Sequence, residues 1–129
     1  MHYQRKIFGY ECDLYGHLNN ANYLHLYEEA RAAALEELDL SVNTLNSLGW
    51  QIYVTRVELD FIKGLALEEV ASVESKVEKI SRVSSLWLQE IYDSAGELCN
   101  RARVKAVFIK SGKPSRLEKN LYQKFQDCL

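Results

Sequence analysis

The sequence has few residues of the kinds that break or cross-link a chain. It contains one proline and six glycines among 129 residues, which argues against a disordered or linker-rich protein. No apolar run approaches the roughly 18 residues of a membrane-spanning helix, and the first residues lack an apolar signal core. The formal net charge of −2 gives no overall attraction to nucleic acid or membranes. We therefore expect a cytoplasmic protein that binds neither.

Cysteine and histidine are also scarce. The three cysteines are Cys12, Cys99 and Cys128. An odd number without a regular spacing predicts free thiols in a reducing compartment. The carboxylate of Asp13 should raise the pKa of the neighbouring Cys12 thiol, so we do not assign Cys12 as a nucleophile. The three histidines have no partners at metal-site spacing, and we expect no metal or other cofactor.

The length predicts one domain that covers residues 1–129. The longest helical pattern spans residues 21–38, where one apolar stripe recurs at intervals of three and four. The stripe consists of Tyr23, Leu26, Tyr27, Ala30, Ala34 and Leu38. A short helix is predicted over 42–48. A third helix is predicted over 116–127, where Ser115 and Glu118 have the spacing of a capping box.

Alternating patterns predict five strands, over residues 2–10, 52–61, 72–79, 83–92 and 98–109. A regular strand over 52–61 would place Tyr53, Val57 and Phe61 on one face, with Ile52 and Val54 on the other. The later strands have short connections, so the sheet should be largely antiparallel. These elements predict an α+β fold in which a long antiparallel sheet curves around the long helix. Pairing of exposed sheet edges predicts a homodimer or a dimer of dimers.

The chemistry concentrates in residues 11–23, where a carboxylate, a glycine, an imidazole and three asparagines precede the long helix. Asp13 lies just ahead of the helix start, which we place near Ala21. The backbone N–H groups near Asn22 and Tyr23 have no helical acceptor and carry the positive end of the helix dipole. Such groups can polarise a carbonyl while the carboxylate acts as nucleophile or general base. Asp13 could instead fix the loop as an Asx-turn residue.

In this context the segment from Asp13 to Tyr23, followed by residues 27–31, resembles the hot-dog-fold thioesterases of the 4-hydroxybenzoyl-CoA thioesterase type. Residues 57–63, 81–84 and Val107 also fall where that family has similar residues. The resemblance implies a sheet wrapped around the central helix, paired sheets in a dimer and active sites at the dimer interface. It also implies hydrolysis of an acyl-CoA or related thioester, with the aspartate at position 13 as the catalytic carboxylate.

Other candidate site residues have two interpretations each. His17 is either a positioner or proton carrier near Asp13, or a hydrogen-bonded turn residue. Some relatives have a histidine where this chain has Asn20, which either holds water or the carbonyl, or caps the helix. Asn22 and Tyr23 are candidate substrate-binding residues. For the CoA phosphates the candidates are Lys63, Arg82 and Arg103.

Two alternative functions stay open at this point. The thioester could be carried by an acyl-carrier protein rather than by CoA, or the chain could bind an acyl thioester without hydrolysing it. Aromatic residues could line the acyl pocket. The candidates are Tyr15, Tyr23, Tyr53, Phe61 and Trp87.

Overall fold

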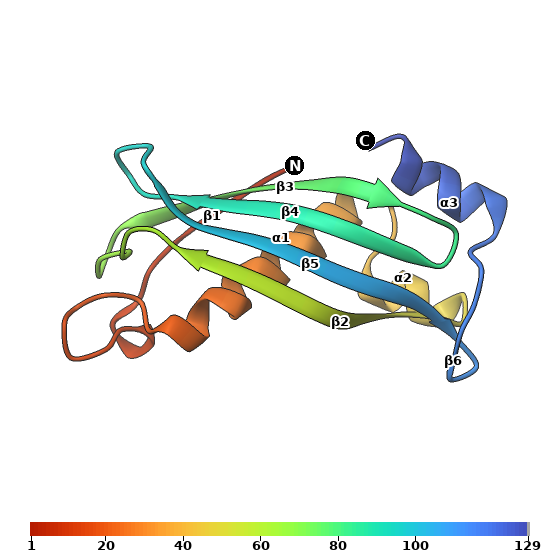
Figure 1. Ribbon diagram of the computed structural model, residues 1–129, viewed down its shortest axis with the longest axis horizontal. Helices are drawn as coiled ribbons and strands as arrows, with labels where there is room; N and C mark the ends of the chain where they lie inside the picture. The colour runs from red at the N-terminus through yellow and green to blue at the C-terminus, as the bar shows by residue number, and fades with distance from the viewer. Residues whose placement is uncertain (129) are drawn as a thin grey trace.

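The computed structural model describes residues 1–128 and has the predicted α+β architecture (Figure 1). Its strands are β1 (His2–Lys6), β2 (Trp50–Phe61), β3 (Val70–Ile80), β4 (Ser84–Tyr92), β5 (Leu98–Lys110) and the short β6 (Lys113–Pro114). Its α-helices are α1 (Tyr23–Glu37), α2 (Val42–Ser47) and α3 (Lys119–Gln126), and two single 3₁₀ turns, η1 (Gly9–Glu11) and η2 (Asn20–Asn22), precede α1. The strands pair in the order β1-β3-β4-β5-β2, β6 pairs with β5, and every pairing is antiparallel.

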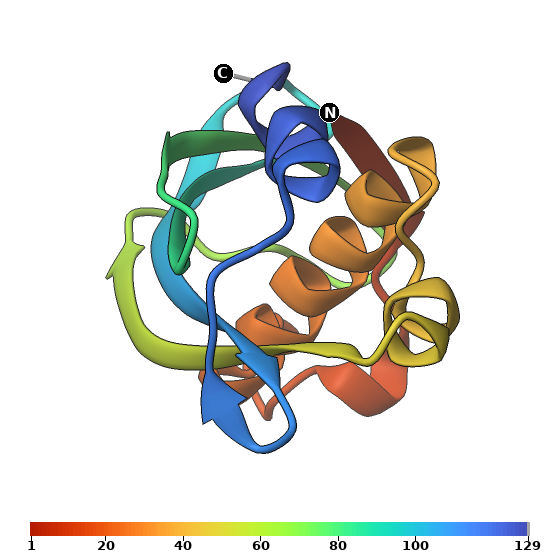
Figure 2. The same cartoon turned by 90° about the vertical axis from the view of Figure 1, so that its right-hand side faces the viewer.

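The sheet curls around α1, as the view along the long axis of the molecule shows (Figure 2). The predicted stripe of α1 faces the sheet, and its residues from Tyr23 to Ala34 are buried, whereas Leu38 is half-buried and Leu35 is buried in addition. Helix α3 covers one end of this core, where Phe125 packs against Phe108 with ring centroids 5.4 Å apart. A long antiparallel sheet wrapped around one central helix is the hot-dog architecture that the sequence predicts.

Three element ends differ from the prediction. The first strand ends at Lys6 rather than at residue 10, because residues 9–11 form the turn η1. Helix α1 starts at Tyr23 rather than near Ala21, because η2 occupies the three preceding residues. The capping box expected at Ser115 does not form: Ser115 Oγ donates to the carbonyl of Lys113, and α3 starts only at Lys119.

Strand β2 contains a β-bulge that changes which side chains face α1. Its register with β5 shifts between Val54 and Arg56. Ile52 therefore lies opposite Phe108 and Val57 opposite Val104, and both of these β5 residues are buried against the helix side of the sheet. The prediction that Ile52 and Val54 share the outer face with Arg56 is thus wrong, because the extra residue of a bulge reverses the alternation.

Strand β2 is also an open edge of the sheet. It pairs only with β5 among the described residues, and it spans 12 residues. Exposed apolar side chains lie along it at Tyr53, Val54, Val57 and Phe61. A long apolar edge strand presents unpaired backbone groups to a second strand.

None of the helices within residues 1–128 is both long and apolar enough to span a bilayer.

Candidate active site

The Asp13 loop is a tight turn closed by its own backbone and by the aspartate. The N–H of Asp13 donates to the carbonyl of His17 at 2.9 Å, and the N–H of Gly16 donates to the carbonyl of Asp13 at 3.2 Å. Asp13 Oδ1 accepts from the N–H of Tyr15 at 2.9 Å and from that of His17 at 3.4 Å. Gly16 has φ 75°, a conformation that side chains disfavour. The Asx-turn interpretation of Asp13 is therefore confirmed.

This turn still leaves one carboxylate oxygen available. Oδ2 of Asp13 accepts no hydrogen bond from residues 1–128, and the side chain is half-exposed. The carboxylate lies close enough to the start of α1 to raise the pKa of Tyr23, although burial of that phenol raises it more. One oxygen fixes the loop, and the other has no hydrogen-bond partner among these residues. Asp13 can thus have both the structural and the chemical role.

The start of α1 lacks a side-chain cap. Asn22 is its N-cap residue, but the Asn22 side chain makes no capping bond and instead donates Nδ2–H to the carbonyl of Glu11 at 2.8 Å. Asn19 Oδ1 caps the preceding turn η2 by accepting from the N–H of Ala21 at 3.0 Å. The capping role considered for Asn20 therefore belongs to Asn19, and the exposed Asn20 side chain is left beside the helix start. The N–H of Asn22 donates to the carbonyl of Asn19 at 2.9 Å within η2, so the N–H groups that a ligand could bind are those of the first turn of α1 itself.

A buried ion-pair network holds this loop against the helix. Glu11 is 3% exposed, and its carboxylate binds Arg5 through Nη1 at 2.7 Å and Nη2 at 2.5 Å. Arg5 Nε also donates to Glu29 on α1 at 2.6 Å. The Arg5 bonds hold the pKa of Glu11 below its usual range. The carbonyl of the same Glu11 accepts from the N–H of Asn19 at 3.0 Å, so the network positions the segment that carries Asp13.

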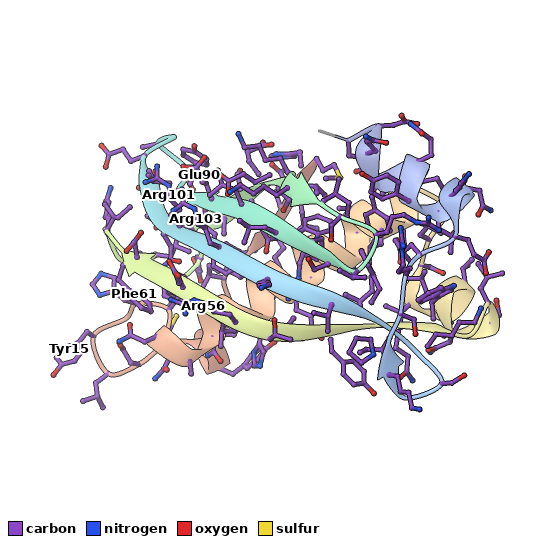
Figure 3. The ribbon with its side chains drawn as sticks, turned by 45° about the vertical axis from the view of Figure 1, so that its right-hand side comes forward. Tyr15, Arg56, Phe61, Glu90, Arg101 and Arg103 are labelled. Atoms are coloured by element: carbon purple, nitrogen blue, oxygen red, sulfur yellow. The ribbon has the colours of Figure 1, made fainter. Side chains whose placement is uncertain are left out.

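The aromatic and imidazole side chains around the loop have different environments. The imidazole of His17 packs over Gly64, where an added Cβ would lie 3.2 Å from Cδ2 of the ring. Tyr23 is 2% exposed, and its ring centroid lies 5.3 Å from that of Phe61 in an edge-to-face contact, so the structure places this ring in the core. Figure 3 shows Phe61 at the end of β2 beside the Asp13 loop, and Tyr15 pointing outward from that loop. Tyr15 is 79% exposed.

All three basic residues assigned to CoA phosphates have other partners in the structure, and Nε of Arg103 lies 3.6 Å from Oε2 of Glu78. Lys63 Nζ donates to Asp93 at 2.7 Å and to Glu97 at 2.5 Å, and both bonds raise its pKa. Arg82 donates through Nε and Nη2 to the carbonyl of Leu117, at the end of the sheet remote from the Asp13 loop (Figure 1). Their assignment to phosphates stays a prediction that these contacts do not support.

A cavity of about 340 Å³ opens between α1, α2 and the start of β2. Its walls are mainly apolar and include Leu35, Ile52, Val54 and Trp87, whereas Arg31 on α1 contributes a cation. Two of the aromatic residues considered for an acyl pocket, Tyr53 and Trp87, line this cavity. Arg31 was missed, although it lies next to the apolar stripe and among alanines, where a long side chain can reach the sheet.

All three cysteines are free. Partial burial, followed by the charge of Asp13, raises the pKa of Cys12, which agrees with the decision not to assign it as a nucleophile. Residues 1–128 contain no group of three histidine, cysteine, aspartate or glutamate side chains that could hold a metal ion.

Comparisons with known proteins agree with this geometry. The family model of the thioesterase-like superfamily matches residues 9–125. The chain is 29% identical over 132 residues to the long-chain acyl-CoA thioesterase FadM of Escherichia coli K12, which covers all of this chain and 99% of the relative. The DHNA-CoA thioesterase of Staphylococcus aureus superposes with a TM-score of 0.91 at 25% identity, covering 98% of this chain and 88% of that one. A protein of Aquifex aeolicus has the same fold, with a TM-score of 0.92 at 22% identity, covering 97% and 98%.

Proposed function

Since the chain belongs to the thioesterase-like superfamily and is a thioester hydrolase with the hot-dog fold, we propose that it cleaves acyl-CoA to a free acid and CoA with Asp13 as the catalytic carboxylate. The observation that supports this role most directly is that the two carboxylate oxygens of Asp13 are bonded differently. Oδ1 of Asp13 is fixed by two backbone N–H groups, and Oδ2 is free at the uncapped start of α1. The likeness to FadM supports CoA as the carrier.

The chemistry follows from the two groups that meet there. The thioester carbonyl accepts from the free N–H groups at the start of α1, which stabilise the negative charge that develops on its oxygen. Asp13 either attacks the carbonyl carbon, which expels the CoA thiolate and leaves an acyl anhydride that water then opens, or removes a proton from a water that attacks the same carbon and expels the thiolate. Single turnover in heavy-oxygen water distinguishes the routes, because only the anhydride route can leave the label in the Asp13 side chain.

The pairing of two subunits would complete this site. The open edge β2 has the exposed apolar side chains expected of an interface, so we propose a homodimer formed by antiparallel pairing of two β2 strands. In such a pair the Phe61 end of one strand lies beside the Trp50 end of the other. Because Phe61 contacts Tyr23 at the helix start, the Asp13 loop of one subunit would approach the cavity of the second.

The catalytic assignment is tested by Asp13→Asn. Release of CoA thiol from a panel of acyl-CoAs should fall by at least about a hundredfold, the range of a lost general base or more. Asp39→Asn is the matched control: Asp39 is exposed at the far end of α1, and asparagine tolerates its φ of 58°. Full activity in Asp13→Asn would refute the role of Asp13. Assay of one acyl group on CoA and on an acyl-carrier protein decides between the carriers.

The dimer is tested by Val57→Lys, which places a charge at the middle of the open edge. Sedimentation equilibrium should show a dimer for the wild type and a shift toward monomer for the variant, with lower activity. Val83→Lys, at the exposed turn between β3 and β4, is the control that should stay dimeric. A monomeric wild type with full activity would contradict the proposal.

A further inference from the structure

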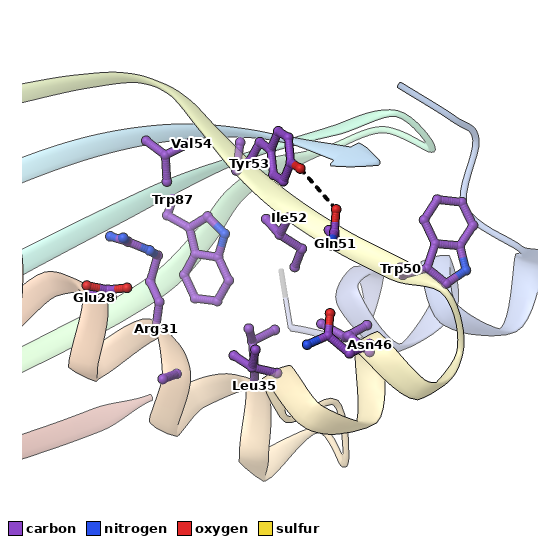
Figure 4. A pocket seen from close by; sticks show the side chains of 14 residues that line it. Glu28, Arg31, Leu35, Asn46, Trp50, Gln51, Ile52, Tyr53, Val54 and Trp87 are labelled. Atoms are coloured by element: carbon purple, nitrogen blue, oxygen red, sulfur yellow. Dashed lines mark hydrogen bonds between the residues drawn. The ribbon is translucent and has the colours of Figure 1, made fainter. Parts of the chain in front are cut away.

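The cavity beside α1 combines apolar walls with one cation. Figure 4 shows Arg31 rising from α1 into the space between the helix and the sheet, with its guanidinium near Trp87 and Val54. Leu35 and Ile52 lie further along the same space, toward α2. The apolar walls can accommodate a hydrocarbon segment of a ligand. The guanidinium of Arg31 is a charged group that could bind a polar end of that ligand.

Buried hydrogen bonds hold Arg31 in this position. Its Nη1 donates to Gln89 Oε1 at 2.8 Å. Gln89 is fully buried, and its Nε2 donates to Ser75 Oγ at 2.8 Å and to the carbonyl of Tyr27 at 3.1 Å. The amide of Gln89 is therefore oriented from three sides, and it presents its oxygen to the guanidinium. Buried partners thus fix the position of the Arg31 side chain, which distinguishes it from an arginine on the solvated surface.

Arg31 has an acidic neighbour in the cavity, Glu28, but no direct carboxylate partner. Arg31 forms no ion pair with the carboxylates of residues 1–128, whereas Arg5, Arg56 and Arg101 each do. Burial lowers its pKa, with a smaller opposing effect of Glu28. A half-buried guanidinium with unused N–H donors binds a carboxylate well, because the two planar groups can form paired charge-assisted bonds.

We infer that this cavity binds an acyl group that carries a carboxylate at the end remote from the thioester, and that Arg31 recognises that carboxylate. The inference rests on the proposed thioesterase function. Arg31 is eight residues beyond the first residue of α1, about 12 Å along the helix axis, so it can reach the far end of an acyl group but not the reacting carbonyl. Arg31 is a specificity residue in this scheme.

Glu28 lines the same cavity as Arg31, and its substitution should have the opposite effect on the use of carboxylated substrates. It lies one turn before Arg31 and lines the same cavity, with an exposed side chain. Its negative charge opposes a substrate carboxylate while helping to keep the guanidinium charged. Removal of that charge by Glu28→Gln should therefore improve the use of carboxylated substrates relative to simple ones.

The test compares matched pairs of substrates: hexanoyl-CoA with adipoyl-CoA, octanoyl-CoA with suberoyl-CoA, and decanoyl-CoA with sebacoyl-CoA. For at least one pair, the wild-type kcat/KM should be higher for the carboxylated member. Arg31→Gln should reduce that preference at least about tenfold, because it removes a charged hydrogen bond. Glutamine can still donate to Gln89. Arg116→Gln, at an exposed residue, is the control and should keep the wild-type ratio.

Binding provides a second readout that does not need turnover. Both tryptophans of the chain, Trp50 and Trp87, line the cavity, so their fluorescence reports its occupation. CoA thioethers with either a methyl or a carboxylate end cannot be hydrolysed. The carboxylated thioether should bind more tightly to the wild type and lose this advantage in Arg31→Gln.

The outcomes separate the two proposals. Hydrolysis of simple acyl-CoAs without a preference for any carboxylated member, or a preference that survives Arg31→Gln, overturns the inference and leaves the thioesterase proposal standing. Absence of any hydrolysis, together with Arg31-dependent binding of the carboxylated thioether, refutes the proposed function and supports the cavity assignment. Equal binding of both thioethers overturns the inference whatever the activity.

Discussion

Arg5→Met should destabilise the protein strongly, because it leaves the Glu11 carboxylate buried without its partner. The Glu11 side chain is 4% exposed and that of Arg5 is 19% exposed, so solvent cannot replace the lost bonds. Loss of one member of a buried ion pair costs about 3–5 kcal/mol. An unfolding entropy of about 2.1 cal/mol/K per residue gives about 0.27 kcal/mol/K for the chain, so Tm should fall by about 11–18 °C.

Thermal unfolding followed by circular dichroism measures this change. Arg56→Met is the matched control: its ion pair with Glu58 is exposed at both side chains, so the loss should stay within about 1 kcal/mol, or less than about 4 °C. The double variant Arg5→Met/Glu11→Gln should recover at least half of the lost Tm, because it buries no charge. Its glutamine oxygen can still accept from the N–H of Phe8, which Glu11 Oε1 holds at 3.1 Å.

The same substitution should lower activity at temperatures where the variant is folded, because the Glu11 carbonyl anchors Asn19 and Asn22 at the helix start. A Tm loss no larger than that of Arg56→Met would refute the assignment of this network as a buried ion pair. A double variant no more stable than Arg5→Met alone would show that the cost comes from lost packing rather than from an unpaired charge.

Three further expectations follow from other contacts. Glu11 and Asp93 have pKa values below their usual range in the folded state, so their stabilisation is complete above about pH 4.5 and is lost as the pH falls through the folded values; urea unfolding across acidic pH should show this, and an unchanged stability would contradict it. Tyr27→Phe removes the hydroxyl that donates to Asn100 Oδ1 at 2.7 Å, leaving a buried acceptor unpaired, and urea unfolding should show a loss of about 1–3 kcal/mol. Gly16→Ala should cost about 1–2 kcal/mol at its positive φ, Gly16→Asn clearly less, and equal losses in calorimetry would exclude backbone strain as the cause.

The architecture could be predicted because it depends on local periodicity. The stripe from Tyr23 to Ala34 repeats every three to four residues over a full helix, and each of the four long strands, β2 to β5, spans nine residues or more, so helix and sheet can be separated by pattern alone. The short connections between the later strands then predict an antiparallel sheet. Element ends were less predictable, since residues 9–11 and 20–22 form single turns that no period distinguishes from the neighbouring strand or helix.

The candidate site was predictable only in part, because its residues compete for the same partners. Asn19, Asn20 and Asn22 all have side chains that can cap a helix, and only the folded loop decides that Asn19 caps while Asn22 binds Glu11. Lys63 was predicted from its charge as a phosphate ligand. Its acidic partners are some thirty residues away in the sequence, and their proximity depends on how the strands pair.

The bulge in β2 is not visible in the sequence pattern, and it decides which side chains of β2 line the cavity. Without the extra residue near Thr55, the regular alternation that places Val57 and Phe61 against α1 would also turn the Tyr53 ring inward and Ile52 outward. The bulge reverses this order, so Ile52 and Val54 line the cavity together with Tyr53, whose hydroxyl donates to Oε1 of Gln51 at 3.0 Å (Figure 4). Space for an acyl group beside Arg31 therefore depends on one inserted residue, and the hydrophobic pattern of the strand does not reveal it.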